Sequence, residues 1–502
     1  MKLIRSSSKR KASSELEVGN YVDRQVDILN ILFISTEAEP FAKSGGLGDV
    51  IGSLPRELNK LGVDARVMLP LYKSIQHKYQ AKMKFITEFT VKLSWRTQYC
   101  GIFQMQQEGV NFYFLDNEQY FFRDSYYGYY DDGERFAYYS KAALEALPVL
   151  DFTPDILHCS EWQTALVPVY LKTLLKEKPS YSRLKTVFTI HNIEYQGEFD
   201  QGILHDLLGI SETDRGILEY DGTINYMKGA IVTCDRLTTV SSSYAEEITY
   251  PYYGKGLENI IKENRYKLSG ILNGIDTKSY NPFRDPFIAA KFSKNNPEKK
   301  QENKTALQSS LGLAPDAEIP IIAMIGRLAE HKGIDMVINV FDDLMREKVQ
   351  FVLLGTGEAK YEDFFRKKAL EYKDRMSVFT AFSAELASRI YAGADLFLMP
   401  SLSEPCGLAQ MICLRYGTIP IVRETGGLKD SIVPFNPKTE KGNGITFQSV
   451  NEQDMIGAVK RAIKLFWDKE QWPILVNNGL KSDFSWKTSS KEYMRLYKEL
   501  LK

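Results

Sequence analysis

The chain has 502 residues, too many for a single hydrophobic core, so we expect at least two domains. Lys and Arg together number 64, as do Asp and Glu, and the formal net charge is zero. This balance excludes a global attraction to nucleic acid or anionic membrane, so neither is an expected partner. No apolar run is long enough to span a bilayer.

Residues 1–29 are predicted to form a disordered N-terminal extension. Their first part is basic and rich in serine, and it lacks the apolar core of a signal peptide. A plastid transit segment is the alternative, although Glu15 and Glu17 come early for one.

The five cysteines are scattered and form no CxxC pair. This pattern predicts buried thiols in a reducing compartment, not a zinc site or a disulfide framework. We therefore expect a cytoplasmic protein, or a plastid protein if the source is a plant or alga.

Short β-rich runs alternate with helical patterns over residues 30–278, which we take as the N-terminal domain. Such alternation predicts a parallel sheet covered by helices on both faces. One of the expected helices is Arg135–Leu147. The predicted strands are Ile31–Ser35, Arg66–Leu69, Asp155–His158, Thr186–Ile190, Leu237–Val240 and Leu268–Leu272.

A linker-like stretch over Asn281–Asn303 precedes a second series of strands, so residues 279–480 are the expected C-terminal domain. These strands are Pro320–Ile325, Val349–Leu354, Ser377–Phe379, Leu396–Met399 and Ile419–Val422. Residues 481–502 end in a helix that we expect to pack back on the N-terminal domain. The fold class is thus α/β, with two Rossmann-like, doubly wound domains and a ligand cleft beyond the carboxyl ends of their strands.

The first motif, Lys43-Ser44-Gly45-Gly46-Leu47-Gly48-Asp49-Val50, follows the first strand and opens a helix. Glycines let a backbone approach a ligand, and free N–H groups at a helix start attract phosphate. The motif is neither a Walker A loop nor GxGxxG. From the residues alone, an anion site and a plain tight turn remain equally open.

This octapeptide resembles the KTGGL signature of bacterial glycogen synthases and plant starch synthases. The flanking runs Phe33–Glu37 and Asp64–Pro70 look like the same family, and the resemblance extends over Asn30–Leu501. It implies a GT-B glycosyltransferase that retains anomeric configuration and needs neither metal nor cofactor. It also implies a nucleotide-sugar donor, ADP-glucose in this branch, an α-1,4-glucan acceptor, and donor contacts from Lys43, Gly45, Gly46 and Asp49.

Four further residues carry the implied chemistry. His191 ends an apolar strand, where a lone histidine is more often structural, but its resemblance to the family's TVHN motif implies a contact with the donor sugar. Arg327 and Lys332 would stabilise the departing diphosphate. An ordinary solvated basic pair is the alternative, and the resemblance favours the phosphate role. Glu404, in a loop after an apolar strand, looks like the family's catalytic-site glutamate.

Weaker expectations concern the cleft's periphery. The loop Thr425-Gly426-Gly427 follows a strand and could offer N–H donors to phosphate, or form a plain turn. Asn273 resembles a donor-side residue at the domain junction. Phe382 aligns roughly with an aromatic that stacks on adenine in relatives. Tyrosines between residues 126 and 130 would suit either a glucan acceptor or the core.

One position departs from the family pattern. His158-Cys159-Ser160-Glu161-Trp162 stands where the family has H-x-H-D-W, so Glu161 replaces a functionally important Asp on the acceptor side. Glutamate keeps the charge but adds a methylene, and a displacement of roughly 1 Å can cost about 10²-fold in rate. We interpret this change as drift in an active enzyme.

The sequence therefore predicts a glycogen or starch synthase. Another GT-B enzyme, such as a sucrose or trehalose-type synthase, is one alternative, and a need for glucan primer would discriminate. A weakly active, glucan-binding scaffold is another, to which only Glu161 points. A dehydrogenase would need GxGxxG with a ribose-binding acid after the first strand, and no convincing one is present.

Overall fold

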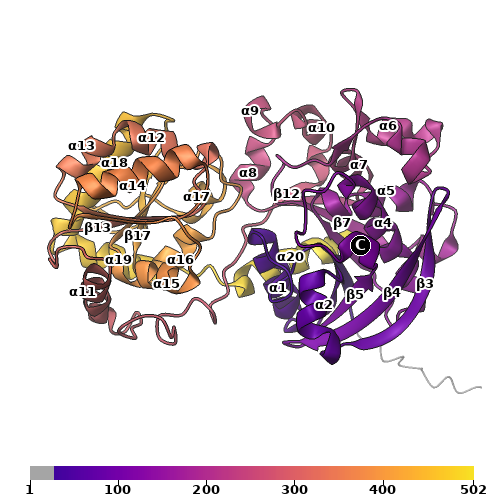
Figure 1. Ribbon diagram of the computed structural model, residues 1–502, viewed down its shortest axis with the longest axis horizontal. Coiled ribbons are helices and arrows are strands. Elements are labelled where there is room, and N and C mark those ends of the chain that lie inside the picture. The colour runs from indigo at the N-terminus through magenta and orange to yellow at the C-terminus, as the bar shows by residue number, and fades with distance from the viewer. Residues whose placement is uncertain (1–27) are drawn as a thin grey trace, which may run out of the picture.

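The computed structural model describes residues 28–502. Residues 1–27 of the predicted N-terminal extension therefore lie outside the described residues. Two α/β lobes lie side by side, with the N-terminal lobe in indigo to magenta and the C-terminal lobe in orange to yellow (Figure 1). Within residues 28–502, the helices lack the length or the apolar stretch needed to cross a bilayer.

The N-terminal lobe is built on a nine-stranded sheet in the order β12-β11-β7-β6-β1-β2-β5-β4-β3. Its central strand β1 pairs in parallel with β2 on one side and β6 on the other. β1 and β6 are buried along nearly their whole length, as expected for strands covered on both faces. The strands are β1 Asn30–Ile34, β2 Asp64–Pro70, β3 Lys84–Leu93, β4 Arg96–Gln107, β5 Val110–Asp116, β6 Ile156–Ser160, β7 Lys185–Ile190, β11 Arg236–Thr239 and β12 Leu268–Gly270.

One edge of this sheet was not predicted. β3 and β4 form a long antiparallel hairpin, and β4 pairs antiparallel with β5. The purely parallel expectation is wrong here because β3 is largely exposed, with few fully buried positions. Antiparallel strands tolerate a face that is exposed to solvent. The sequence of β3 contains no continuous apolar stretch, so it did not predict a buried strand.

Helices cover both faces of the sheet, and a small three-stranded sheet flanks it. The predicted helix at 135–147 is α4, which begins three residues earlier. The elements are α1 Gly46–Asn59, α2 Lys73–Tyr79, α3 Glu118–Phe121, α4 Asp132–Ala146, α5 Leu166–Lys172, α6 Arg215–Leu218, α7 Tyr226–Thr233, α8 Ser242–Glu247, α9 Pro251–Gly254, α10 Glu258–Glu263, β8 Glu198–Phe199, β9 Glu219–Tyr220 and β10 Thr223–Asn225.

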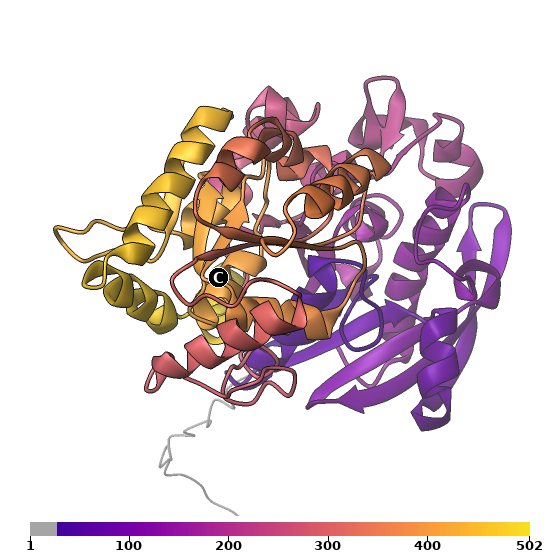
Figure 2. The same ribbon diagram turned by 60° about the vertical axis from the view of Figure 1, so that its left-hand side comes forward.

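The C-terminal lobe has a six-stranded, wholly parallel sheet in the order β15-β14-β13-β16-β17-β18. Helices lie above and below it, as the side view also shows (Figures 1 and 2). The strands are β13 Ile321–Ile325, β14 Gln350–Leu354, β15 Met376–Phe379, β16 Leu396–Met399, β17 Ile419–Arg423 and β18 Ile445–Phe447, the last not predicted. The helices are α11 Lys300–Ser310, α12 Ile334–Asn339, α13 Phe341–Arg346, α14 Ala359–Glu371, α15 Ala384–Gly393, α16 Ala409–Arg415, α17 Gly426–Ser431, α18 Glu452–Trp467 and α19 Gln471–Lys481; the last helix, α20 Trp486–Leu500, packs on the N-terminal lobe.

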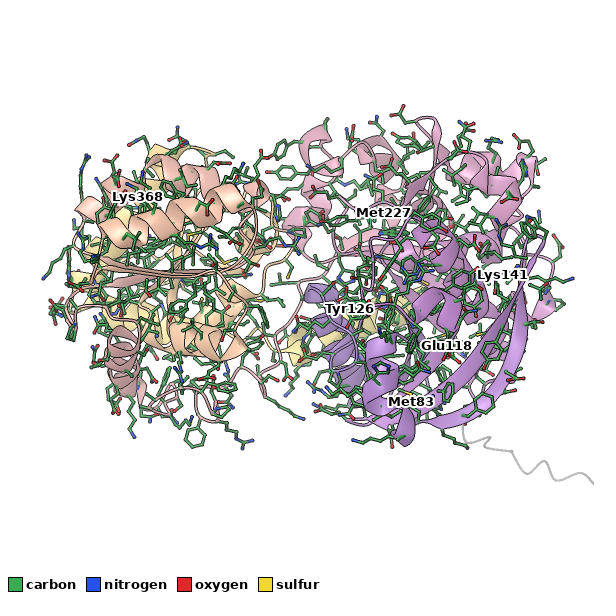
Figure 3. All side chains as sticks on the ribbon, viewed as in Figure 1. Met83, Glu118, Tyr126, Lys141, Met227 and Lys368 are labelled. Carbon is green, nitrogen blue, oxygen red and sulfur yellow. The ribbon has the colours of Figure 1, made fainter. Side chains whose placement is uncertain are left out.

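The chain crosses between the lobes twice, and the two crossings touch. Ile275 donates its N–H to the carbonyl of Phe484 at 2.7 Å, and a Cβ on Gly274 would approach the Trp486 nitrogen to 2.6 Å. After the second crossing, α20 lies against the N-terminal lobe, where the Tyr497 hydroxyl is 2.7 Å from Nδ1 of buried His158. Side chains fill the interior of both lobes (Figure 3).

Candidate active site

A cavity of about 1130 Å³ lies between the lobes and is lined from both sides. Its walls are loops that follow β1, β6 and β7 in the N-terminal lobe and β13 and β16 in the C-terminal lobe. These are carboxyl ends of parallel strands, where open α/β sheets bind ligands. Nine of the predicted site residues line this cavity: Gly45, Gly46, Asp49, Glu161, His191, Asn273, Arg327, Lys332 and Glu404.

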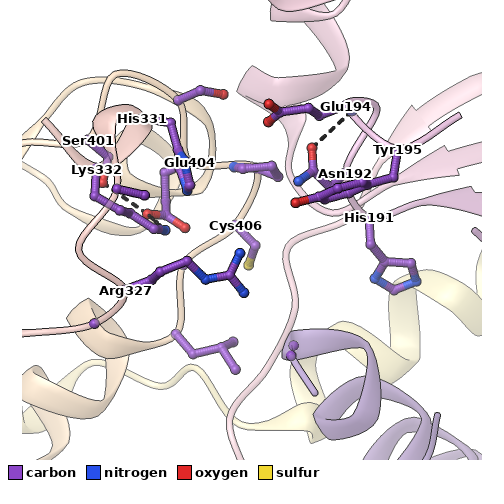
Figure 4. Close-up of a pocket in the computed structure, with 18 of the residues that line it drawn as sticks. His191, Asn192, Glu194, Tyr195, Arg327, His331, Lys332, Ser401, Glu404 and Cys406 are labelled. Atoms are coloured by element: carbon purple, nitrogen blue, oxygen red, sulfur yellow. Dashed lines mark hydrogen bonds and ion pairs between the residues drawn. The ribbon is translucent and has the colours of Figure 1, made fainter. Parts of the chain in front are cut away.

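The C-terminal wall carries the cations Arg327 and Lys332 together with three carboxylates, Glu330, Glu358 and Glu404. Lys332 Nζ is 2.6 Å from Glu404 Oε2, which also accepts a hydrogen bond from Ser401 Oγ at 3.0 Å. Arg327 follows β13 and is exposed to the cavity, and within residues 28–502 its guanidinium makes no ion pair. Arg327, Lys332 and Glu404 face the histidine loop of the other lobe across the gap (Figure 4). The wall therefore offers an uncompensated cation to an anionic ligand.

His191 stands at the end of β7 on the opposite wall. Burial lowers the pKa of its imidazole to about 3, so the ring is neutral at physiological pH. Its Nε2 is buried and finds no hydrogen-bond partner among the described residues. A buried polar atom without a partner is costly, so this nitrogen of a cavity-lining residue is a candidate for a hydrogen bond to a ligand.

Glu161 lies beside this histidine in a strained backbone conformation, with φ of 66°. Its Oε1 accepts the backbone N–H groups of His191 and Asn192, the latter at 2.9 Å. Burial raises the pKa of this carboxyl to about 8, against the lowering effect of those two N–H donors. The glutamate side chain, which is one methylene longer than aspartate, thus reaches the loop that carries His191. Hydrogen bonds to the backbone of this loop link Glu161 to His191.

The Gly-rich turn is already occupied by a carboxylate from its own lobe. Glu37, which comes soon after β1, accepts the N–H of Ser44 at 2.6 Å and that of Gly45 at 3.3 Å. It also accepts the hydroxyls of Ser44 at 2.6 Å and Tyr127 at 2.9 Å. Sequence reasoning missed Glu37, which is buried and lines the cavity. The sequence feature that could have identified Glu37 is an acidic residue between the first strand and a Gly-rich turn.

Lys43 is not among the cavity-lining residues, although Asp49 is. Its Nζ pairs with Asp49 at 2.6 Å and with Glu39 at 3.0 Å. Burial lowers the pKa of Lys43, but the charges and hydrogen bonds of these two acids outweigh it, and the pKa is raised overall. Burial raises the pKa of Asp49 to about 6 despite the lysine. Lys43 is therefore a charged group held beside the cavity.

Thr425, Gly426 and Gly427 lie outside the cavity lining, and two of their donors are used. The Thr425 hydroxyl and the Gly426 N–H both donate to Glu247 Oε1, each at 2.9 Å. The glycines are required for close packing, because a Cβ on Gly426 would approach the Glu404 carbonyl oxygen to 2.0 Å. In this structure the loop contacts Glu247 and the Glu404 loop, and its role in phosphate binding stays a prediction.

The remaining predicted residues differ in whether they line the cavity. Asn273 is buried beside Cys406 of the other lobe, and its Oδ1 finds no partner among the described residues. Phe382 is 93% exposed and lies outside the cavity lining. Of the tyrosine cluster, Tyr127 lines the cavity, whereas Tyr126 packs on Tyr72 with ring centroids 4.8 Å apart.

The five cysteines are free thiols, all buried. Across residues 28–502, no three His, Cys, Asp or Glu side chains are grouped so that they could hold a metal ion.

Comparisons with known proteins agree with this architecture. A family model described as the starch synthase catalytic domain matches residues 30–263, and one described as glycosyl transferases group 1 matches residues 312–472. The structure resembles the catalytic domain of starch synthase IV from Arabidopsis thaliana bound to ADP and acarbose, with a TM-score of 0.86 and 34% identity over 94% of this chain and 99% of that one. A sucrose-phosphate synthase from Thermosynechococcus elongatus, at TM-score 0.59 and 15% identity over 94% and 99% of the two chains, shares the fold alone.

Curated relatives match over nearly their whole length. A glycogen synthase of Geobacillus thermodenitrificans is 48% identical over 476 residues, which cover 94% of this chain and 98% of the relative. A glycogen synthase of Alkaliphilus metalliredigens is 48% identical over 474 residues, covering 94% and 100%. The chain therefore belongs to the glycogen and starch synthase family of GT-B glycosyltransferases, and it is a glucosyltransferase.

Proposed function

We propose that the enzyme transfers glucose from ADP-glucose to the non-reducing end of an α-1,4-glucan with retention of anomeric configuration. The observation that carries this proposal is the asymmetry of the cavity. An accessible guanidinium and a lysine line one wall, and a neutral histidine with a buried carboxyl lines the other. ADP in the starch synthase IV structure supports the adenine nucleotide.

In this proposal the C-terminal wall holds the leaving group. Breaking the bond between the glucosyl carbon and the phosphate oxygen places negative charge on ADP. Arg327 and Lys332 stabilise that charge more in the transition state than in the ground state, which accelerates the reaction. Glu404 orients Lys332 through their 2.6 Å ion pair. Its other carboxylate oxygen accepts a hydrogen bond from a sugar hydroxyl.

The N-terminal wall positions the sugar and the acceptor. His191 Nε2 pairs with a hydroxyl of the donor glucose, which satisfies the buried nitrogen. Glu161 uses one oxygen for the His191 loop and offers the other to the acceptor's 4-hydroxyl. Asn273 and the Gly45-Gly46 turn, held by Glu37, complete this wall.

The acceptor's 4-oxygen attacks the anomeric carbon on the face from which ADP departs. One carbon–oxygen bond forms, the bond to phosphate breaks, and the acceptor proton passes to a phosphate oxygen. Closure of the lobes excludes water from the cavity and favours transfer over hydrolysis. The partners are thus a nucleotide-sugar and an α-glucan, which suits a cytoplasmic enzyme.

The decisive experiment incubates purified protein with radiolabelled ADP-glucose or UDP-glucose, with and without glycogen primer, and with EDTA throughout. We expect primer-dependent incorporation from ADP-glucose into a product that an α-1,4-specific glucanase digests. Incorporation from UDP-glucose alone would overturn the donor assignment. Glycogen binding without incorporation from either donor would instead indicate a glucan-binding scaffold.

A further inference from the structure

Two short helices from different lobes meet at the domain boundary. α8 of the N-terminal lobe faces α17 of the C-terminal lobe (Figure 1). Glu247, at the end of α8, accepts the Thr425 hydroxyl and the Gly426 N–H at the start of α17, each at 2.9 Å. In return, Asp430 of α17 accepts the N–H of Ser243 in the first turn of α8 at 2.9 Å. Each helix thus provides a carboxylate that caps the N-terminus of the other helix across the boundary. A negative charge is stabilising at a helix N-terminus.

The same N-terminal segment also holds the Glu404 loop directly. Ser241, the N-cap of α8, donates its hydroxyl to the carbonyl of Pro405 at 2.6 Å. Further along, Arg423 Nη2 donates to the Tyr253 hydroxyl at 3.2 Å. The same guanidinium donates to the carbonyl of Leu402 at 2.6 Å. Both sides of Glu404 are therefore connected to the N-terminal lobe.

The start of α17 transmits any shift to Glu404 through backbone contact. Gly427 donates its N–H to the Glu404 carbonyl at 3.1 Å. A Cβ on Gly427 would come within 2.1 Å of the Cys406 carbonyl oxygen, so no free space separates the two segments. Close-packed backbone cannot absorb a displacement locally.

We propose that Glu247 is a positioning residue for the transfer reaction, because it fixes the Glu404 loop relative to the N-terminal lobe. We call the whole contact the interlobe clasp. It consists of Ser241, Ser243, Glu247 and Tyr253 on one side, and Pro405, Arg423, Thr425, Gly426 and Asp430 on the other. The clasp anchors Glu404 and Lys332 to the lobe that carries His191 and Glu161, so both walls converge on one sugar when the cavity closes. This inference rests on the proposed function, since it assumes that Glu404 contacts the donor.

The first test compares Glu247→Ala with Glu246→Ala in the full-length protein. Glu246 precedes it on α8 but pairs with Arg265 of its own lobe, so it is a matched control. We expect Glu247→Ala to lower kcat about tenfold with the KM for ADP-glucose within about twofold of wild type, because misplacement affects the transition state most. Glu247→Gln keeps an oxygen that can accept both donors and should restore kcat to within about threefold of wild type. Glu246→Ala should behave as wild type.

A second readout needs no substrate. Deuterium exchange of peptides containing Gly426 and Gly427 should accelerate at least about fivefold in Glu247→Ala, while peptides from β13 stay unchanged. Absence of glucose transfer by the wild type would refute the proposed function and leave this exchange result standing. The clasp is overturned if Glu247→Ala keeps wild-type kcat, if Glu246→Ala is equally impaired, or if exchange at the glycines does not change.

Discussion

The two walls of the cavity differ in how their charged groups are buried and paired. On the C-terminal wall, Arg327 makes no ion pair within the described residues, and Lys332 pairs with Glu404 at 2.6 Å. On the N-terminal wall, Glu37 and Glu161 are buried acids, and the nearby Lys43 is already paired with two carboxylates. The exposed guanidinium of Arg327 supports the proposal that the diphosphate binds the C-terminal wall and the sugar the N-terminal wall.

The two lobes nevertheless have one structural feature in common. In each, a Gly-rich helix start that could bind phosphate is occupied by an internal carboxylate: Glu37 at Ser44 and Gly45, and Glu247 at Thr425 and Gly426. The first carboxylate comes from the same lobe and shapes the wall, whereas the second comes from the other lobe and links the two. A Gly-rich turn therefore identifies an anion site without showing which anion fills it.

The largest effect should follow loss of the free cation. We expect Arg327→Ala to lower kcat about 10³-fold, since it removes stabilisation of charge that develops in the transition state. Its melting temperature should stay near that of wild type, because the side chain makes no ion pair within the described chain. Arg366→Ala, which removes a guanidinium paired with Glu362 and Asp363, is the control. A parallel fall in melting temperature and activity would contradict the assignment.

Glu161→Gln tests the acidic wall through pH. Burial raises the Glu161 pKa to about 8, so the carboxylate forms as pH rises through that value, and wild-type activity should rise with it. His191, with a pKa near 3, does not titrate in this range. Glutamine should lower activity about 10²-fold at pH 9, less at pH 6, and should abolish the inflection.

Stability gives an independent check on the same group. Because its folded-state pKa is raised above the ordinary value of about 4.3, folding is favoured while Glu161 is protonated, and this contribution declines as pH rises towards 8. The melting temperature of Glu161→Gln relative to wild type should therefore increase over that window. A constant difference would show that Glu161 has an ordinary pKa.

Gly427→Ala should have an intermediate effect. Its Cβ would meet the Cys406 carbonyl oxygen at 2.1 Å, so the Glu404 loop must shift. We expect kcat to fall about tenfold and the melting temperature to fall by a few degrees. Gly457→Ala in α18, where the nearest atom is 3.7 Å away, is the matched control and should not lose activity. Wild-type kinetics in Gly427→Ala would refute the supporting role of this glycine.

Phe382→Ala should have the smallest effect. The ring is 93% exposed and lies outside the cavity lining, so we expect the KM for ADP-glucose to change less than about twofold. A rise of about tenfold, measured from initial rates, would show instead that the ring stacks on adenine, as the family resemblance implies.

The sequence by itself determined most of the parallel strands and the loops after them that line the cavity. Apolar runs such as Leu396–Met399 are buried strands, and the loop that follows carries Glu404, because hydrophobic pattern and chain order are local properties. The exposed hairpin of β3 and β4 gave no such pattern and was missed, and the buried strands β5 and β18 were missed although they are apolar.

Only the tertiary structure decided which polar groups are free. Glu37 and Gly45 are eight residues apart, but Glu247 and Gly426 are separated by 179, and no local pattern pairs them. Whether an N–H is available to a ligand depends on every acceptor that folding brings within reach, since buried donors are nearly always satisfied. The same reason explains why the partnerless Nε2 of His191 and the raised pKa of Glu161 became visible only in the folded chain.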